Sequence, residues 1–369
     1  MNAAVLAVIA IGQAVFITLL LALLVTRRVV GGLSRRRGLG KIEACLDSVN
    51  LWLAGHADQP ALIADLEELS FSELSGFLQR LSLQVGGEDW ERLTEVVRKT
   101  SWFEEVRDRA VSRYWWRRLQ ATQALIATAT PAEEPLVEAL IRDEQPAIQR
   151  AAVWCLRRVQ SRRLSRAVLD LAGSQPRILR RHILEVLAEN RQQVLGPLVD
   201  SLAMGSSRDE LRTSLTLAEM MGVPSLLEHV LPHASSEDLE VRISAARALA
   251  AYPHPNSSRA LVGLLNDDAW QVRAQAATGL GAIGAREAAS NLDEAITDPN
   301  WWVRLRSALA LRRLGEPGVR LLEQRTPEPD AYAYEMARYV LGLETAAVAE
   351  YGGSHAIDFS EALASEQAA

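Results

Sequence analysis

Cysteine and lysine are both scarce in this chain of 369 residues. The two cysteines, Cys45 and Cys155, lie in separate apolar helical patterns, with no paired motif at ligand spacing. This excludes a disulfide framework and a zinc motif, and it favours reduced, half-buried thiols. Lysine occurs only at Lys41 and Lys99, so nearly all positive charge is arginine. Apolar residues make up 49% and charged residues 23%, which is normal for a globular chain.

The motifs that carry most enzyme chemistry are also missing. There is no phosphate-binding glycine loop of the Walker or dinucleotide type, no HExxH and no GxSxG. The only histidines at metal-ligand spacing are His229 and His233, and Pro232 between them is expected to end the helix, so they need not share a face. We therefore predict no catalytic, cofactor-binding or metal site, and a protein that is not an enzyme.

A long uncharged segment opens the chain. Residues 1–26 contain no charged residue, and within them residues 3–25 form an apolar run long enough to cross a hydrocarbon core of about 30 Å. Basic residues follow this run and none precedes it, so the positive-inside tendency places the remainder in the cytoplasm. We expect a single-pass anchor over residues 1–26 in the inner membrane, with the N-terminus outside.

The next segment, residues 27–40, is expected to form a basic tether. Six basic residues occur from Arg27 to Lys41, interspersed with glycines. Glycine makes such a segment flexible, and its positive charge suits contact with anionic lipid head groups.

Two further segments flank the main body of the chain. Residues 41–105 show short amphipathic patterns, and Ser70 with Glu73 has the spacing of a capping box, so a short helical segment is expected there. Residues 344–369 lack sustained periodicity and contain acidic residues but no lysine or arginine. This composition predicts a disordered acidic tail.

Between residues 106 and 343 the chain repeats itself. "VRISAARAL" begins at Val241, "VRAQAATGL" at Val272 and "VRLRSALAL" at Val303, at intervals of 31 residues. Weaker copies begin at Trp116, Ile148, Leu179, Leu211 and Ala333. We call the helices expected at these copies and at the three above the B helices. A second, equally periodic set of expected helices, the A helices, lies between them, so each repeat unit is a pair of antiparallel helices. Because one helix pair cannot bury its own apolar face, we predict an all-α solenoid of about eight stacked pairs.

The residues five positions ahead of these B-helix motifs are small and polar. They are Asp143, Ser174, Ser206, Ser236, Asp267 and Asp298. Such side chains can accept hydrogen bonds from the unpaired N–H groups at a helix start, so they are predicted to be N-caps.

The recurring columns, namely Asp, Val-Arg, Ala-Ala, Leu and Gly, resemble the HEAT repeat. The copies containing Asp267 and Asp298 match closely, and they are similar to the short bacterial form that also occurs in phycobilin lyases. The resemblance covers roughly residues 110–343 and implies a polar ladder along the stack. The ladder residues that it assigns are Asp267, Asp298, Arg180, Arg212, Arg242, Arg273 and Arg304. Many non-catalytic proteins share the repeat, so it leaves lyase activity as a distant alternative.

Several tryptophans and arginines are not required by the repeat. Trp270 and Trp301 share a column and are expected to pack, whereas Trp302 breaks the column. Arg and Trp are frequent in binding hot spots. The candidate interaction surface therefore comprises Trp302, Arg306, Arg312, Arg313, Arg157, Arg158, Arg162 and Arg163.

The charge distribution leaves a second function open. From Arg107 to Arg181 there are 15 arginines against 7 acidic residues, and such an excess of positive charge can bind phosphate groups. The overall charge of −6 argues against a dedicated nucleic-acid binder. We therefore favour a membrane-anchored cytoplasmic scaffold that binds a membrane-associated partner protein. A nucleic-acid or anionic-ligand binder using residues 107–181 is the alternative.

Overall fold

The computed structural model describes residues 40–204 and 207–351, and within these ranges every regular element is a helix. Among the residues described, no helix is long and apolar enough to cross a bilayer. The predicted anchor at residues 3–25 and nearly all of the predicted tether lie outside the described ranges, as does most of the predicted tail. The described chain divides into two compact units, one ending at Arg158 and the other beginning at Val159.

The N-terminal unit begins with a helix over residues 40–53. Its further helices are α2 (Gln59–Glu67), α3 (Phe71–Leu81), α4 (Gly87–Val97), α5 (Ser101–Ala110), α6 (Trp115–Thr128), η1 (Pro131–Glu133), α7 (Glu134–Ile141), α8 (Pro146–Val153) and η2 (Trp154–Arg157). The predicted capping box is confirmed, since the N–H of Ser70 donates to Glu73 Oε2 at 3.0 Å. Because α3 and α5 pack directly on α6, the unit continues across the expected boundary at residue 105.

A buried carboxylate joins three elements of the N-terminal unit. Glu133, at the end of η1, is 3% exposed and accepts hydrogen bonds from Arg98 and Arg107. It also accepts from the N–H of Thr130 at 3.1 Å, which closes a capping box. The ring of Phe103 lies against both guanidinium groups, at 4.7 and 5.0 Å from their Cζ atoms. A buried charge of this kind is tolerated because every oxygen is hydrogen-bonded.

The C-terminal unit consists of successive helix pairs. Its A-side elements are α9 (Arg162–Gly173), α11 (Arg191–Met204), α13 (Leu227–Val230) between η3 (Pro224–Leu226) and η4 (Leu231–Ser235), α15 (Pro255–Leu264), η5 (Arg286–Ala288) with α17 (Ala289–Ala295), and α19 (Glu316–Glu323). Its B helices are α10 (Arg177–Glu189), α12 (Arg208–Met221), α14 (Leu239–Leu249), α16 (Trp270–Ile283), α18 (Trp301–Arg313) and α20 (Ala331–Gly342). The last helix, α21 (Thr345–Tyr351), contacts α18. Every B helix expected from the repeat is present, counting α6 and α8 of the first unit.

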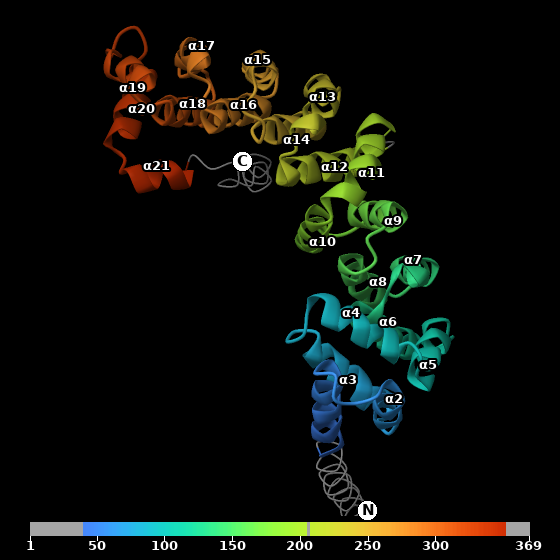
Figure 1. Cartoon of the computed structure of the whole chain (residues 1–369). Helices are drawn as coiled ribbons and strands as arrows, with labels where there is room; N and C mark the ends of the chain where they lie inside the picture. The colour runs from blue at the N-terminus through green and yellow to red at the C-terminus, as the bar shows by residue number, and fades with distance from the viewer. Residues whose placement is uncertain (1–39, 205–206, 352–369) are drawn as a thin grey trace, which may run out of the picture. The chain divides into compact units, whose positions relative to one another are not determined.

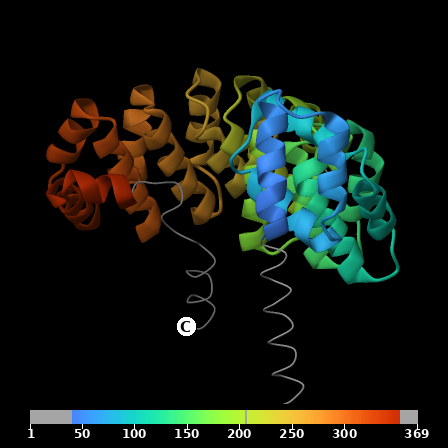
Figure 2. The same ribbon diagram turned by 60° about the horizontal axis from the view of Figure 1, so that its bottom comes forward.

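Within this unit the helices form two layers (Figure 1). Each B helix packs on its own A helix and on the next B helix along the chain. In Figure 1, α13, α15 and α17 lie on one side of the row formed by α14, α16 and α18. Figure 2 shows the helices of this unit side by side in sequence order. The apolar face that one pair leaves uncovered is thus buried by its neighbour.

Helices α16 and α18 approach closely at a glycine. A Cβ atom built on Gly281 would lie 2.8 Å from the Cα of Ala310. Gly281 and Ala310 therefore allow these two helices to approach closely. Further small side chains are buried in the two helices, among them Ala276, Ala277 and Ala308.

The polar column in front of the B helices does not cap them, contrary to the prediction. Asp267 and Asp298 lie two residues before the actual N-caps, Ala269 and Asn300. Each carboxylate instead accepts a hydrogen bond from the N–H of that N-cap residue, at 2.9 and 2.7 Å. The actual N-caps across the repeats are Gln145, Pro176, Ser207, Asp238, Ala269 and Asn300. This local turn leaves the carboxylate available to the preceding repeat.

Candidate protein-interaction surface

A ladder of arginine–aspartate pairs links neighbouring repeats, as predicted for the centre of the stack. Nε and Nη2 of Arg242 donate to Asp267 at 2.7 and 3.0 Å. Nε and Nη2 of Arg273 donate in the same way to Asp298, at 2.7 and 3.1 Å. Nη1 of Arg273 donates backwards to the carbonyl oxygen of Asp267 at 2.8 Å. Each arginine thereby ties the loop of its own repeat to the loop of the next.

The same pair occurs in the N-terminal unit, one residue away from its expected place. Nε of Arg118 donates to Asp143 at 2.6 Å, across the same 25-residue separation as in the later repeats. The first B-helix motif therefore begins at Arg117 and not at Trp116. Gln149, where the next arginine is missing, still donates to the carbonyl oxygen of Asp143 at 2.7 Å. At this repeat the ladder position therefore keeps its hydrogen bond to the loop before its own helix.

Three assigned ladder arginines, Arg180, Arg212 and Arg304, depart from the pattern. Arg180 donates Nη2 to the carbonyl oxygen of Gln175 at 3.1 Å. Arg212 pairs with Glu240 at 3.2 Å, because the corresponding column position holds serine. Arg304 donates Nη1 to the carbonyl oxygens of Asp298 and Pro299, at 2.8 and 3.0 Å. Its Nε is shielded from water and has no hydrogen-bond partner in the described part of the chain.

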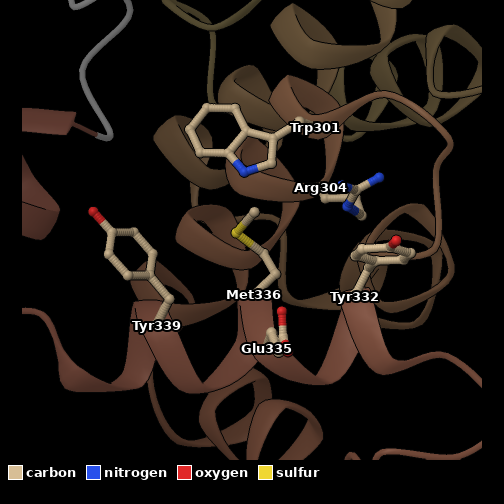
Figure 3. A pocket seen from close by; sticks show the side chains of 6 residues that line it. All are labelled: Trp301, Arg304, Tyr332, Glu335, Met336 and Tyr339. Atoms are coloured by element: carbon tan, nitrogen blue, oxygen red, sulfur yellow. The ribbon is translucent and has the colours of Figure 1, made fainter.

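Arg304 lines a cavity of about 220 Å³ between α18 and α20. Trp301 and Arg304 come from α18, and the opposite wall is formed by α20 through Tyr332, Glu335, Met336 and Tyr339. Figure 3 shows Arg304 and Tyr332 at one end of the cavity and Tyr339 at the other. The three aromatic side chains are exposed, with Trp301 46%, Tyr332 71% and Tyr339 54% accessible. An exposed aromatic cluster around a cationic group is typical of a binding site.

The exposure of Trp301 differs from the expectation. Trp301, which was expected to pack, is exposed and lines the cavity, whereas Trp302 is only partly exposed. Their rings meet edge to face, with centroids 4.8 Å apart. Trp270, in the same column as Trp301, packs on the core formed by Ala274 and Val303. The difference arises because α18 covers Trp270, whereas α20, which is equivalent one repeat later, leaves a cavity beside Trp301.

Three arginines of α18 that were expected at the surface have different environments. Arg306 is 3% exposed, so the expected exposure there is wrong, and burial lowers the pKa of its guanidinium to about 10. Arg312 donates to the carbonyl oxygens of Val340, Leu341 and Leu343, which satisfies the C-terminal end of α20. Arg313 is exposed, as expected.

The second arginine group is divided between the two units. Arg157, in the first, is exposed and lies over the ring of Trp154, at 4.5 Å from the centroid. Arg158 is partly buried, and desolvation lowers its pKa. Arg162 and Arg163, in the second unit, are exposed.

Many arginines of the basic segment already contact carboxylates. Those with an ion pair are Arg107, Arg109, Arg118, Arg142, Arg162, Arg166 and Arg181. Paired guanidinium groups have less capacity for phosphate. The local arrangement therefore favours structural and surface ion pairs over a phosphate-binding groove.

An exposed aromatic turn connects α5 and α6 and was not singled out from the sequence. Val111 is 73% exposed, and Tyr114, Trp115 and Trp116 follow it on the surface. Tyr114 stacks on Trp116 with centroids 4.7 Å apart, and Arg113 lies over the Tyr114 ring. The signal available in the sequence was the cluster "RYWWRR" at the start of a helix.

Cys45, Cys155 and His233 have structural environments. Cys45 and Cys155 are free and buried, and burial raises the pKa of both thiols to about 12. Nε2 of His233 lies 3.0 Å from the carbonyl oxygen of Leu202, and burial lowers the pKa of this imidazole. In the described ranges, no group of three potential ligands is placed to hold a metal ion.

Comparison with known proteins supports the fold at two levels. Residues 195–277 and 259–342 match the family model described as HEAT repeats. No curated protein matches the chain. Among solved structures, a multiply substituted variant of Kap121p is similar at 12% identity, with a TM-score of 0.55, over 89% of this chain and 42% of that one.

Two complexes of the same karyopherin are similar to a comparable degree. Kap121p bound to the extreme C-terminus of the protein phosphatase Cdc14p matches at 11% identity, with a TM-score of 0.53, over 86% of this chain and 41% of the other. Kap121p bound to Nup53p matches at 11% identity, with a TM-score of 0.53, over 86% and 40%. The chain thus spans less than half the length of these neighbours, and at this identity the likeness concerns the fold alone. Residues 195–342 match HEAT repeats, and the described chain is an all-α HEAT-repeat solenoid whose fold resembles that of Kap121p.

Proposed function

We propose that this protein is a non-enzymatic, membrane-anchored scaffold whose C-terminal unit binds a partner protein through the α18–α20 cavity. The observation that carries the proposal is the cluster of exposed Trp301, Tyr332 and Tyr339 around Arg304. Large aromatic side chains and arginine supply most of the binding energy at protein interfaces, and they are seldom left exposed together without a partner.

The fold and the comparisons support a binding role of this kind. HEAT-repeat solenoids are typical of protein-interaction scaffolds because their stacked helices present long continuous surfaces. The structural neighbour Kap121p holds a phosphatase C-terminus in one complex and Nup53p in another. We transfer from them only the use of the solenoid to hold a peptide or protein.

The sequence supports a position at the inner face of a bacterial membrane, in an envelope or signalling complex. The apolar run at residues 3–25 is followed, and not preceded, by basic residues. The aromatic turn at residues 111–117 adds Trp, Tyr and Arg side chains of the kind found at membrane–water interfaces. A turn of this composition would hold the N-terminal unit against anionic head groups.

The test compares three forms of the full chain in native membranes. The double variant Trp301→Ala/Tyr339→Ala removes two side chains that line the cavity, and Ile178→Ala removes a more exposed apolar side chain elsewhere in the same unit. After nuclease treatment, proteins co-purified with the wild type are quantified against both variants. The proposal expects at least one protein lost from the double variant and retained by Ile178→Ala. Equal recovery in all three would overturn it.

A further inference from the structure

Three arginines define what the ladder position binds. Arg118, Arg242 and Arg273 each donate Nε and Nη2 to one aspartate of the next repeat, with Nε at 2.6 to 2.7 Å. The side chains of the Arg273–Asp298 pair are 15% and 10% exposed. The molecule thus contains its own examples of the ligand that this guanidinium environment accepts, which is a carboxylate held by two parallel hydrogen bonds.

Arg304 makes the hydrogen bonds to its own loop but, within the residues that the structure describes, has no carboxylate of the next repeat as a partner. Its Nη1 makes both bonds to its own loop, as the Nη1 of Arg273 does. The equivalent column residue of the following repeat is Glu328, which lies exposed two residues before the N-cap Asp330. Nε of Arg304 finds no acceptor among the residues placed by the structure. A buried donor without a partner costs about 1–3 kcal/mol, which a ligand that supplies the acceptor recovers.

Two other ladder arginines show why the cavity matters. Nε is also without a partner at Arg180 and Arg212, within the described ranges. Arg212 nevertheless reaches Glu240 with another nitrogen at 3.2 Å, and Arg180 donates to the carbonyl oxygen of Gln175 at 3.1 Å. Arg304 differs because it lines a cavity with exposed apolar walls. When a partner covers these walls and excludes water, the local dielectric falls and an ion pair formed there becomes stronger.

We propose that the α18–α20 cavity binds an acidic side chain of the partner protein, whose carboxylate accepts from Nε and Nη2 of Arg304 as Asp298 accepts from Arg273. An apolar residue beside that carboxylate packs on Trp301 and Tyr339. This inference rests on the proposed function and names the chemistry of its ligand. Since Nε is shielded from water, binding requires a rotation of Arg304 or of the exposed Tyr332 ring, 5.6 Å from its Cζ.

Glu335 lines the same cavity and sets a charge condition on the ligand. Its carboxylate repels an incoming anion, so the acidic side chain must enter at the end occupied by Arg304 and Tyr332 (Figure 3). Neutralising Glu335 should therefore strengthen binding of an acidic peptide. A site that recognised only apolar surface would not respond in this way.

The probe is a pair of blocked heptapeptides with the sequence of residues 296–302, "ITDPNWW", one with Asp and one with Asn at position 298. This segment presents the carboxylate that fills the equivalent position one repeat earlier. Binding to the full chain in mild detergent is followed by fluorine NMR after incorporation of 5-fluorotryptophan, with the Trp301 signal assigned from Trp301→Phe. The aspartate peptide should shift that signal saturably, with a Kd about tenfold or more below that of the asparagine peptide.

Three variants complete the test. Arg304→Lys keeps the charge but cannot form the paired hydrogen bonds, and should weaken the aspartate peptide about tenfold while leaving the asparagine peptide unchanged. Glu335→Gln should strengthen it severalfold. Arg212→Lys, the matched ladder control, should bind like the wild type, and the remaining fluorine signals report whether each variant is folded.

The outcomes separate this inference from the proposed function. Equal binding of the two peptides, or an Arg304→Lys variant that binds like the wild type, overturns the carboxylate assignment. If partner capture still depends on Trp301 and Tyr339, the proposed function stands without it. An aspartate peptide that binds tightly but shifts signals other than that of Trp301 also overturns the assignment, since the carboxylate would then occupy another site.

Discussion

Arg273 of α16 holds Asp298, in the loop before α18, through two parallel hydrogen bonds of 2.7 and 3.1 Å. The same aspartate accepts from the N–H of Asn300 and so fixes the loop that precedes α18. One side chain therefore sets both the loop geometry of its own repeat and the distance to the preceding one. The pair is largely buried, so breaking it should lower the free energy of unfolding more than breaking an exposed ion pair.

Removing this carboxylate should destabilise the C-terminal unit. Asp298→Ala leaves the Arg273 guanidinium without its partner, and we expect the free energy of unfolding to fall by about 2–4 kcal/mol. Urea denaturation of Asp298→Ala, Arg273→Ala and the double variant measures the coupling of the pair. The matched control is Asp170→Ala, which breaks the exposed Arg166–Asp170 pair and should cost less than about 1 kcal/mol. Strictly additive effects of the two ladder substitutions would show that the pair does not couple the repeats.

Replacing glycine by alanine should have opposite effects at Gly281, in the contact between α16 and α18, and at Gly263, in α15. Gly281→Ala places a methyl group 2.8 Å from the Cα of Ala310 and should destabilise the unit by about 1–3 kcal/mol. Gly263→Ala, within α15, meets no atom within 4 Å and should stabilise it by up to about 1 kcal/mol. The midpoints of urea unfolding compare the two directly. A neutral Gly281→Ala would mean that the helices are less closely packed than described.

Glu219 of α12 should make stability depend on pH. Burial raises its pKa to about 7 from an ordinary value of 4.5, against the opposing effect of Arg247 and Arg181. The protonated form is therefore favoured by folding, and its contribution is complete below about pH 4.5 and lost as the pH rises through about 7. Glu219→Gln removes this loss, so its stability relative to the wild type should increase by up to about 3 kcal/mol between pH 5 and 8. Glu185→Gln, on an exposed site, is the control, and a Glu219→Gln difference that stays constant with pH contradicts the assignment.

The expected topology can be examined with two reporters at the C-terminus. Because the apolar run is followed by arginines, a cytoplasmic reporter fused there should be active and a periplasmic reporter inactive. Replacing the arginines at positions 27, 28, 35, 36 and 37 with glutamine should weaken this preference. Activity of the periplasmic reporter on the unaltered chain would place the solenoid on the other side of the membrane.

Much of the fold could be predicted from the sequence because the repeat constrains it. The B-helix motifs have a fixed spacing, and the Arg242–Asp267 pair lies in the columns that the resemblance assigned. The environment of single residues was harder to predict, since it depends on the neighbouring helix. Arg306 occupies a column in which Ser244 and Gln275 are also buried, so its charge gave a false indication of exposure.

The cavity itself could not be found from the sequence. Trp270 and Trp301 are equivalent in the repeat, and only the side chains that α20 supplies opposite Trp301 leave it exposed. The aspartates were assigned as N-caps because capping and ladder residues are both short and polar, and a difference of two positions at a helix start lies within the uncertainty of any sequence pattern. The candidate site thus arises where the repeat ends, and repeat statistics carry least information there.

The central claim, that the α18–α20 cavity binds a partner protein, is tested most directly by photocrosslinking in native membranes. A benzoylphenylalanine residue replaces Tyr339 in one form of the full chain and Ile178, outside the cavity, in another. We predict a discrete crosslinked product from position 339 that disappears when Trp301→Ala is added, and no such product from position 178. The absence of a product from position 339, or its persistence after Trp301→Ala, would contradict the claim.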